Sequence, residues 1–364
     1  MTALAELIAA RIRLHGPMPL SDYMQLCLLH PDHGYYATRD PFGRAGDFIT
    51  APEISQMFGE LVGLALAQSW LDQGSPSGVT LAEVGPGRGT LMADMQRVMR
   101  RVPGLTQAAG TVLVEASGHL RGVQARAVPQ ARHVGDCADL PQAPLFLVAN
   151  EFFDALPIRQ YQRVEGGWAE RMVTLRDGAL ALALGPALDL PRAGAIGDVF
   201  EDCPALPGIV DQIAGRIARH GGAAIVIDYG NWDGQGDTFQ ALRQHRPEDP
   251  LAHPGMADLT AHVDFAAIAA AALRAGAVAS QMVTQGAWLL SLGAAHRAEA
   301  LARAGDAGAA AALKRLTDAQ EMGQLFKAVA IWPKGAPPVP GFVAAQPGDR
   351  GQPRQNVLSQ DGKD

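Results

Sequence analysis

The spacing of hydrophobic and polar positions changes along the chain, from a helical period at the start to short apolar runs further on. Apolar residues recur every three or four positions over residues 3–14, which predicts an amphipathic helix. The same spacing predicts helices over residues 20–29 and 52–72, with a loop rich in glycine, proline and aromatic residues at 30–48. The first fifty residues are therefore expected to form a helical segment ahead of the main fold.

Beyond residue 78 the pattern alternates between short apolar runs and stretches with helical spacing. The apolar runs predict strands at residues 79–84, 111–115, 132–134, 145–149, 223–228, 278–284 and 327–332. The intervening stretches predict helices at residues 90–100, 207–219, 264–275 and 293–322. Apolar strands joined by helices are typical of a mostly parallel sheet that is covered on both faces. The sequence therefore predicts a doubly wound α/β fold.

A long stretch between the fourth and fifth predicted strands interrupts this alternation. Turn signals at residues 165–167 and 177–178 flank β-like runs, which predicts an inserted antiparallel β meander over residues 158–185. Residues 229–262 show no regular pattern. The tail from residue 333 is rich in proline and glycine and is expected to be irregular.

Composition places the chain among globular proteins and removes several classes of function. Hydrophobic residues make up 48% and charged residues 18% of the 364 residues, and the net charge is −7. This balance suits a packed core and gives no general attraction to nucleic acid or to an acidic membrane. No apolar run is long enough to span a membrane. The three cysteines are widely spaced, which favours reduced thiols in a cytosol-like compartment over a disulfide framework or a metal site.

A glycine-rich turn follows the strand predicted at residues 79–84 and opens a helix. The segment reads Glu83-Val-Gly85-Pro86-Gly87-Arg-Gly89-Thr90. Glycines there allow a tight turn and bring a ligand close to bare backbone. A dinucleotide site requires G-x-G-x-x-G, whereas this chain reads G-x-G-x-G and has Thr90 at the third position. The pattern resembles the first motif of class I methyltransferases, whose cofactor carries no phosphate.

Three carboxylates stand at or just beyond the ends of the first three predicted strands of the sheet. Glu83 suits an ammonium group better than a pyrophosphate, although a strand-end charge that points to water explains it as well. Glu115 ends the second strand, where a carboxylate can accept hydrogen bonds from both hydroxyls of a ribose. Asp136 follows the third strand and either contacts an adenine or caps a turn.

Another acidic cluster stands directly after the fourth predicted strand. Open α/β sheets bind ligands at the carboxyl ends of their strands. Glu151 and Asp154 are three residues apart, so one helical turn would place them on a shared face. We interpret Glu151 as orienting an acceptor and Asp154 as supporting it; alternatively, Asn150 and Asp154 cap a turn before Pro157. His262 is a candidate general base, although a lone histidine is more often structural.

The N-terminal region adds candidates that could close over a bound ligand. Asp47 and Thr50 lie in the loop before the helix predicted at 52–72. Thr50 and Glu53 have the spacing of a capping box, which explains them without a ligand. Tyr35 and Tyr36 either line an acceptor channel or pack in the core.

Several multi-residue blocks occur in a fixed order and carry a family resemblance. The blocks are Gly34-Tyr35-Tyr36, Gly46-Asp47-Phe48-Ile-Thr50-Ala-Pro52-Glu53-Ile-Ser55-Gln56, Glu83 to Thr90, Asn150-Glu151-Phe-Phe-Asp154-Ala-Leu156-Pro157, Asp228-Tyr229-Gly230 and Thr260-Ala-His262-Val-Asp264-Phe265. Together they resemble the MidA-like family, which includes the mitochondrial complex I assembly methyltransferase. The resemblance covers roughly residues 15–333, and ordered blocks are far more specific than one glycine loop.

The resemblance implies a class I fold with a seven-stranded sheet and S-adenosyl-L-methionine as cofactor. The residues expected at the cofactor are Glu83, Gly85, Pro86, Gly87, Gly89, Thr90, Glu115, Asp136, Asn150, Asp47 and Thr50. The residues expected at the reaction are Glu151, Asp154 and His262, and no metal is expected. The domains expected are an N-terminal helical and lid segment at 1–50, a cofactor-binding domain at 51–157 and 220–333, an insertion at 158–219 that forms part of the acceptor site, and an irregular tail at 334–364.

For the mitochondrial members, the resemblance implies symmetric dimethylation of an arginine in the complex I subunit that lines the quinone site. The alternatives are a methyltransferase for a small molecule and a non-catalytic assembly protein that retains the fold. The glycine spacing disfavours an NAD-dependent oxidoreductase. The start of the chain shows no obvious transit peptide, so a bacterial, cytoplasmic relative is expected, or the mitochondrial matrix if the source is eukaryotic.

Overall fold

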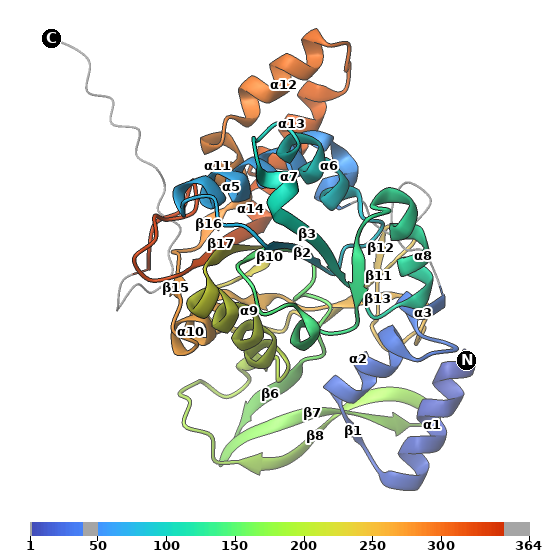
Figure 1. Cartoon of the computed structure of the whole chain (residues 1–364). Coiled ribbons are helices and arrows are strands. Elements are labelled where there is room, and N and C mark those ends of the chain that lie inside the picture. The colour runs from blue at the N-terminus through green and yellow to red at the C-terminus, as the bar shows by residue number, and fades with distance from the viewer. Residues whose placement is uncertain (1, 39–49, 346–364) are drawn as a thin grey trace, which may run out of the picture.

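The computed structural model describes residues 2–38 and 50–345, which are built around one mostly parallel sheet (Figure 1). Five parallel strands lie in the order β4, β3, β2, β5, β10, and β17 pairs antiparallel with β10. Their bounds are β2 (Val79–Val84), β3 (Ala109–Val114), β4 (Arg132–Val134), β5 (Leu145–Asn150), β10 (Gly222–Asn231) and β17 (Phe326–Trp332). Three short strands complete the sheet at its edges: β14 (Val263–Asp264), β15 (Val278–Ala279) and β16 (Val283–Thr284). The predicted doubly wound α/β fold is confirmed, with nine strands in place of seven.

Helices cover both faces of this sheet, because its strands carry apolar side chains on both sides. On β10, Ile225 and Ile227 belong to one core and Ala224 and Val226 to the other. The first core is closed by α5 (Gln56–Asp72), α6 (Thr90–Met99), α7 (Leu105–Ala108), α11 (Gln285–Ser291), α12 (Ala294–Arg303), α13 (Ala309–Thr317) and α14 (Met322–Leu325). The second is closed by α9 (Leu206–His220) and α10 (Phe265–Arg274). Helix α8 (Gly118–Ala127) joins β3 to β4.

The structure corrects several predicted elements. The helix predicted at 52–72 is divided into α4 (Ala51–Ile54) and α5, because Ser55 is extended and its hydroxyl accepts the backbone N–H of Met57 to start α5. The strand predicted at 278–284 is interrupted, so that β15 and β16 pair separately with β17. Helix α11 was not predicted, although Thr284 caps it through the N–H of Ala287.

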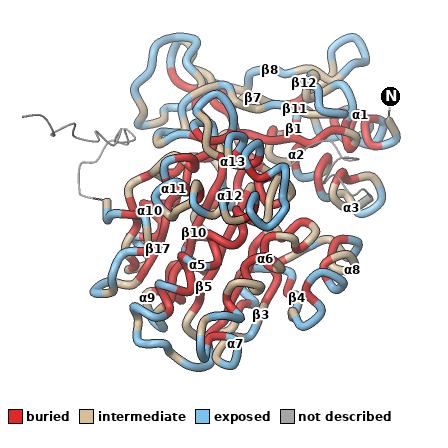
Figure 2. The backbone as a smooth tube through the Cα atoms, turned by 90° about the horizontal axis from the view of Figure 1, so that it is seen from above, coloured by how far each residue is buried: buried red, intermediate tan, exposed pale blue. Residues whose placement is uncertain are grey.

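The N-terminal residues and the insertion pack together as a second body beside the central sheet (Figure 2). Helices α1 (Ala3–His15) and α2 (Leu20–Leu29) confirm the first two predicted helices, and α3 (Tyr35–Thr38) follows them. The predicted meander is confirmed as β6 (Arg159–Val164), β7 (Gly167–Arg176) and β8 (Ala179–Leu188), with β9 (Val199–Asp202) added beside β6. The short β1 (Met18–Pro19) pairs with β7, so the start of the chain completes the inserted sheet. The division into domains stays a prediction.

A small antiparallel sheet lies in the stretch where no regular structure was predicted. It consists of β11 (Gln240–Arg243), β12 (Arg246–Glu248) and β13 (Asp258–Thr260), with β11 in the centre. Ala241 and Leu259 from this sheet are buried in the same core as Leu4 and Ile8 of α1. The sheet therefore connects the N-terminal helices to the chain that follows β10. Among the described helices, none is both long and apolar enough to cross a membrane.

Candidate active site

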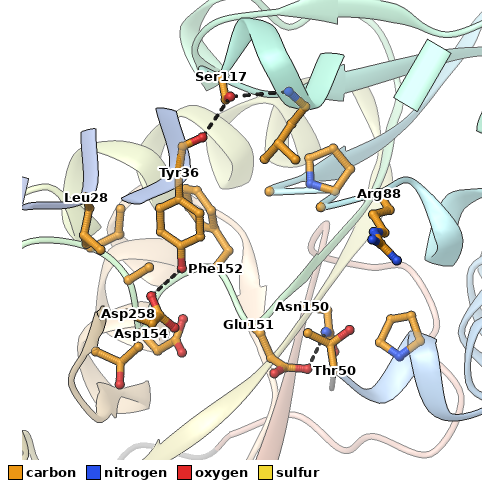
Figure 3. A pocket seen from close by; sticks show the side chains of 18 of the residues that line it. Leu28, Tyr36, Thr50, Arg88, Ser117, Asn150, Glu151, Phe152, Asp154 and Asp258 are labelled. Atoms are coloured by element: carbon orange, nitrogen blue, oxygen red, sulfur yellow. Dashed lines mark hydrogen bonds between the residues drawn. The ribbon is translucent and has the colours of Figure 1, made fainter. Parts of the chain in front are cut away.

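A cavity of about 890 Å³ opens at the carboxyl ends of β2, β3, β5 and β10 (Figure 3). This is the edge at which an open α/β sheet binds ligands. Most of the site residues proposed from the sequence line this cavity, namely Thr50, Glu83, Gly85, Pro86, Gly87, Thr90, Glu115, Asn150, Glu151, Asp154 and His262. Gly89 and Asp136 are not part of the lining, and Asp47 falls outside the described residues.

The glycine-rich turn between β2 and α6 requires glycine for conformational and steric reasons. Gly85, Gly87 and Gly89 all have positive φ, at 64°, 52° and 83°. A Cβ atom on Gly85 would lie 2.9 Å from the ring of Phe152. The turn is anchored by the N–H of Gly85, which donates to the carbonyl of Val114 at 3.1 Å. Its bare backbone therefore forms one wall of the cavity, as the sequence predicted.

Glu83 is a buried carboxylate of which one oxygen, Oε2, has no hydrogen-bond partner among the described residues. Its side chain is 3% exposed, so it does not point to bulk water as one interpretation of the sequence held. No described residue hydrogen-bonds its Oε2 atom, although the carboxylate lines the cavity. Burial raises the pKa of Glu83 well above its usual value, and a backbone hydrogen bond from Met92 opposes this only in part. A buried, unpaired carboxylate is costly, and a cationic group in the cavity would offset that cost.

Glu115 lies at the end of β3 with its carboxylate held in place. Oε1 accepts the N–H of Ser117 at 2.7 Å, and Oε2 accepts the side-chain amide of Gln124 at 3.1 Å. Burial raises the pKa of Glu115, and these hydrogen bonds oppose the shift. A carboxylate has about four acceptor positions, so Glu115 can also accept from two ligand hydroxyls. Asp136 instead accepts the N–H of Ala138 at 2.7 Å and caps the short helix η1 (Cys137–Asp139).

The two carboxylates that follow β5 lie in a turn and not on a helix. Residues 151–156 are non-helical, and Glu151 has a φ of 51°, which is strained for a residue with a side chain. The expectation of one helical turn is therefore wrong, yet both Glu151 and Asp154 line the cavity. Glu151 also accepts the backbone N–H of Ala51 at 3.2 Å and the amide of Asn150 at 3.0 Å.

Asp228, in the second half of β10, holds this turn in place. Its Oδ2 atom accepts the backbone N–H groups of Phe152, Phe153 and Asp154 at 3.2, 2.9 and 3.2 Å. Its Oδ1 atom accepts the N–H of Tyr229 at 2.9 Å. Asp228 is completely buried, and burial raises its pKa against these hydrogen bonds. The sequence placed Asp228 in a family block but gave it no role, because its partners lie more than 70 residues earlier.

Replacing Asp228 with alanine is expected to destabilise the protein by about 3 kcal/mol, because three buried N–H groups lose a charged acceptor. The strained turn should then relax, and activity should fall with stability. Chemical denaturation measures the free energy of unfolding. Asp264→Ala is the matched control, since Asp264 caps α10 through the N–H groups of Ala266 and Ala267 away from the cavity. That variant should lose about 1 kcal/mol and retain full activity. Equal losses of activity in both variants would contradict the role of Asp228.

The environments of Glu151 and Asp154 give the two carboxyl groups different proton affinities. Burial, with the nearby charge of Asp154, raises the pKa of Glu151 to about 8. Burial raises the pKa of Asp154 to about 6, and hydrogen bonds from the Tyr229 hydroxyl and the Ala155 backbone limit the shift. Near neutral pH the site therefore holds one ionised and one mostly protonated carboxyl group. Pairs of this kind are found where a site binds a cation or transfers a proton.

His262 lines the same cavity, two residues after the end of β13. Its ring lies edge-on to Tyr229, with the centroids 5.6 Å apart. Burial and the charge of Lys327 lower the pKa of His262, so the imidazole is neutral near neutral pH. Its backbone N–H donates to the hydroxyl of Thr238 at 2.8 Å.

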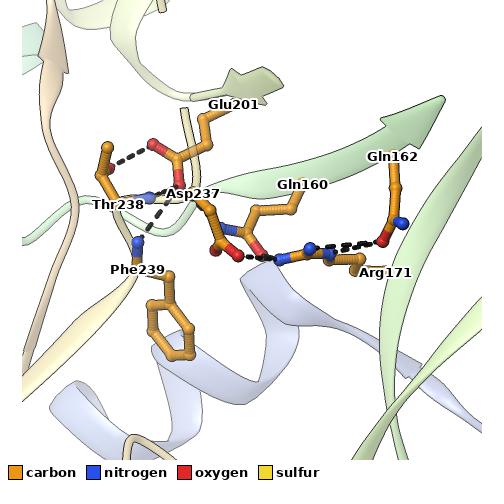
Figure 4. A network of polar contacts seen from close by, with 7 residues as sticks. All are labelled: Gln160, Gln162, Arg171, Glu201, Asp237, Thr238 and Phe239. Carbon is orange, nitrogen blue, oxygen red and sulfur yellow. Dashed lines mark hydrogen bonds and ion pairs between the residues drawn. The ribbon is translucent and has the colours of Figure 1, made fainter. Parts of the chain in front are cut away.

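A polar network fixes Thr238 and so connects the inserted sheet to His262 (Figure 4). The buried Glu201 of β9 accepts the N–H groups of Thr238 and Phe239 at 2.8 and 3.2 Å. It also accepts the side-chain amide of Gln160 at 2.7 Å, while Arg171 pairs with Asp237 at 2.6 Å. The insertion thus supports the segment that carries His262, although none of its own residues lines the cavity; its predicted part in the acceptor site stays a prediction.

The N-terminal candidates have mixed outcomes. Tyr35 is completely buried in the core, whereas Tyr36 lines the cavity and donates its hydroxyl to Asp258 at 2.8 Å. The capping box is not formed, because Thr50 makes no side-chain cap and Glu53 accepts the hydroxyl of Thr90 at 2.6 Å. Asp258 was missed from the sequence because an isolated aspartate in an irregular stretch carries no local signal.

Comparison with known proteins agrees with this geometry. Residues 61–283 match the profile of a family described as "Putative S-adenosyl-L-methionine-dependent methyltransferase". The chain is 37% identical over 91% of its length to "Protein arginine methyltransferase NDUFAF7 homolog, mitochondrial" of Drosophila melanogaster, covering 85% of that protein. It is 36% identical over 73% of its length to the human protein arginine methyltransferase NDUFAF7, covering 68% of it. A Burkholderia thailandensis protein, crystallised bound to S-adenosyl-homocysteine, is 30% identical with a TM-score of 0.81, over 93% of this chain and 94% of that one.

Proposed function

Since the chain belongs to this family of S-adenosyl-L-methionine-dependent methyltransferases, we propose that it transfers methyl groups to an arginine side chain of a protein. The observation that carries the proposal is the pair of carboxyl groups of the half-buried Glu151 and the buried Asp154, in the same cavity as the glycine-rich turn. A guanidinium carries a positive charge and five N–H donors in a planar fork, which two carboxylates can bind. A neutral small-molecule acceptor could hydrogen-bond these acidic groups but would not balance their charge.

We assign the binding of the cofactor to the residues at the ends of β2 and β3. Glu83 would hold the ammonium of the methionyl group, because its Oε2 atom has no partner among the described residues. Glu115 would accept the ribose hydroxyls, and Gly85, Pro86 and Gly87 would form the wall against which the cofactor packs. The further cofactor contacts that we propose are Gly89, Thr90, Asn150, Asp136, Thr50 and Asp47. Of these, Gly89 and Asp136 lie outside the lining, and Asp136 caps η1.

We assign the chemistry to the acceptor end of the cavity. When bound, the cofactor supplies a methyl group whose bond to sulfur breaks, with the electron pair left on sulfur, as its bond to the acceptor nitrogen forms. Glu151 would orient the guanidinium so that one terminal nitrogen faces the methyl group, and Asp154 would balance the positive charge. The nitrogen then loses one proton, and we assign its acceptance to His262, whose imidazole is neutral.

The acceptor is proposed to be a protein because the similar fly and human proteins are named protein arginine methyltransferases. We further propose symmetric dimethylation and, as acceptor, the respiratory complex I subunit that lines the quinone site, which the family resemblance implies. Residues of α2 and α3 and of the small sheet β11 to β13 line the cavity on the acceptor side, and a wall of that kind suits a polypeptide segment. The proposed compartment is the one that contains complex I assembly, the bacterial cytoplasm or the mitochondrial matrix.

Methyl transfer to a complete set of cellular proteins tests this function. The purified chain is incubated with labelled S-adenosyl-L-methionine and proteins from cells that lack its gene, and tandem mass spectrometry locates the label. The expected result is label on arginine terminal nitrogens of few proteins, with the fragmentation of symmetric dimethylarginine. Heat-inactivated enzyme is the control. Label on lysine, on carboxylates or only on small molecules would overturn the arginine proposal.

A further inference from the structure

A third carboxylate reaches the acceptor end of the cavity from a different part of the fold. Asp258 begins β13, is 5% exposed and lines the cavity. Its Oδ1 atom accepts the hydroxyl of Tyr36 at 2.8 Å (Figure 3). Glu151 and Asp154 belong to the turn after β5, so Asp258 faces the cavity from a separate element. Three acidic groups from two segments therefore surround one space.

The three acidic groups are close enough to affect one another. Burial is the main cause of the raised pKa of Glu151. The charge of Asp154 is the next largest cause that raises this pKa, and the charge of Asp258 raises it further. Burial is also the main cause of the raised pKa of the Tyr36 hydroxyl, and the charges of Asp258 and Asp154 raise it further. Like charges held together in a buried site repel one another, and a cation placed between them would relieve the repulsion.

Tyr36 is held at both ends, which fixes the position of its hydroxyl. Its backbone carbonyl accepts the hydroxyl of Ser117 at 3.1 Å, next to the carboxylate of Glu115 (Figure 3). Its ring lies edge-on to Tyr35, with centroids 5.2 Å apart. Because the Tyr36 hydroxyl is fixed, its hydrogen bond to Oδ1 also fixes the orientation of the Asp258 carboxylate.

We propose that Asp258, oriented by Tyr36, binds the edge of the acceptor guanidinium that Glu151 and Asp154 leave unpaired, and thereby selects arginine over lysine. This inference rests on the proposed arginine methylation. A planar guanidinium presents donors along more than one edge, so acidic groups on two sides can each form direct hydrogen bonds. A lysine ammonium is a compact point charge with three donors and cannot span the same groups. The third carboxylate therefore adds affinity for one cation and little for the other.

Binding of two small probes to the full chain loaded with S-adenosyl-homocysteine tests this proposal. The probes are N-acetyl-arginine N-methylamide and its lysine counterpart, titrated by calorimetry or ligand-detected NMR. The wild type should bind the arginine probe about tenfold more tightly than the lysine probe, and Asp258→Asn should remove most of that difference. Tyr36→Phe should remove part of it. Tyr23→Phe is the matched control, because Tyr23 donates to the carbonyl of Pro250 at 2.6 Å outside the cavity lining, and it should leave binding unchanged.

The affinity for S-adenosyl-homocysteine separates recognition from a general structural defect, and it should change less than about twofold in Asp258→Asn and Tyr36→Phe. The proposal is overturned if Asp258→Asn keeps the preference of the wild type for arginine, or if the wild type prefers lysine or binds neither probe. Because the proteome experiment scores arginine methylation separately, methylated arginine with an unaffected Asp258→Asn variant would overturn this inference alone. Absence of methylated arginine would overturn both.

Discussion

Replacing Glu83 with glutamine is expected to weaken the binding of S-adenosyl-L-methionine by about 10- to 100-fold, because a charge-assisted hydrogen bond contributes about 1.5–3 kcal/mol. The folded protein should be at least as stable as the wild type. Glu83 is buried, and no described residue pairs with its Oε2 atom, so the carboxylate costs stability until a cation arrives. Calorimetric titration measures the affinity, and thermal unfolding without cofactor measures the stability.

Glu60→Gln provides the opposite control. Glu60 is as buried as Glu83 but accepts two hydrogen bonds from Arg297, at 2.6 and 2.9 Å, and one from Arg97 at 3.4 Å. Its replacement should lower stability by about 1–3 kcal/mol and leave the affinity for the cofactor unchanged. If Glu83→Gln bound the cofactor like the wild type, or lost as much stability as Glu60→Gln, Glu83 would be a structural residue.

The pH dependence of Glu83 gives the same prediction a second readout. Burial raises the pKa of this carboxyl group, so it is protonated at a higher pH than an exposed glutamate. Binding of an ammonium group stabilises the ionised form and therefore releases a proton. The calorimetric enthalpy of the wild type should depend on the ionisation enthalpy of the buffer, and this dependence should be weaker in Glu83→Gln.

Replacing Glu151 with glutamine is expected to lower kcat by about 100- to 1,000-fold, since one group that positions and polarises the acceptor is lost. The affinity for S-adenosyl-L-methionine should be unchanged, because the assigned cofactor carboxylates are Glu83 and Glu115. Asp154→Asn should lower kcat by a similar factor. Steady-state kinetics with the arginine-containing acceptor identified from the proteome measures both effects. A Glu151→Gln variant with the kcat of the wild type would remove Glu151 from the reaction.

The pH profile of the wild type separates the roles of the two acidic groups. The pKa of Glu151 in the free enzyme is about 8, so kcat/KM should rise as pH increases through that value and the carboxylate ionises. This limb should be absent in Glu151→Gln, while a limb near the Asp154 value of about 6 remains. A profile in which Glu151→Gln keeps the limb near pH 8 would assign that ionisation to another group.

The same shift makes a prediction about stability. Because folding raises the pKa of Glu151 from 4.5 to about 8, the folded state binds the proton more tightly than the unfolded state. The free energy of unfolding should therefore fall as pH rises across that interval. Glu151→Gln cannot ionise, so it should lose less stability than the wild type between these pH values. Ionisation of Glu151 thus raises activity and lowers stability, a trade-off that is common in active sites.

The elements that could be predicted from the sequence are those with a strong local pattern. Strands β2 and β4 match their predicted bounds, because each is bounded by turn residues. Strands β11 to β13 were missed because each has only three or four residues and their pairing joins segments that are not adjacent in the chain. The two-residue β1 is a strand only because β7 lies beside it.

The site was predicted where a motif carries the chemistry locally, and it was missed where the chemistry depends on tertiary contacts. The glycine turn and Glu151 stand in a strand-to-turn context that the sequence shows. Asp228 and Asp258 acquire their roles from the backbone N–H groups of residues 152–154 and from the Tyr36 hydroxyl, which only the fold brings near them. The predicted Thr50–Glu53 capping box is absent for the same reason, because the Glu53 carboxylate instead accepts a hydrogen bond from the hydroxyl of Thr90.

A crystal structure of the enzyme with S-adenosyl-homocysteine and an arginine-containing acceptor peptide tests the central claim most directly. The account predicts the ammonium of the cofactor product on Glu83, its ribose on Glu115 and the guanidinium between Glu151 and Asp154, with one terminal nitrogen directed at the sulfur. A guanidinium bound elsewhere, or a cofactor product whose ammonium does not contact Glu83, would contradict the assignment of this cavity.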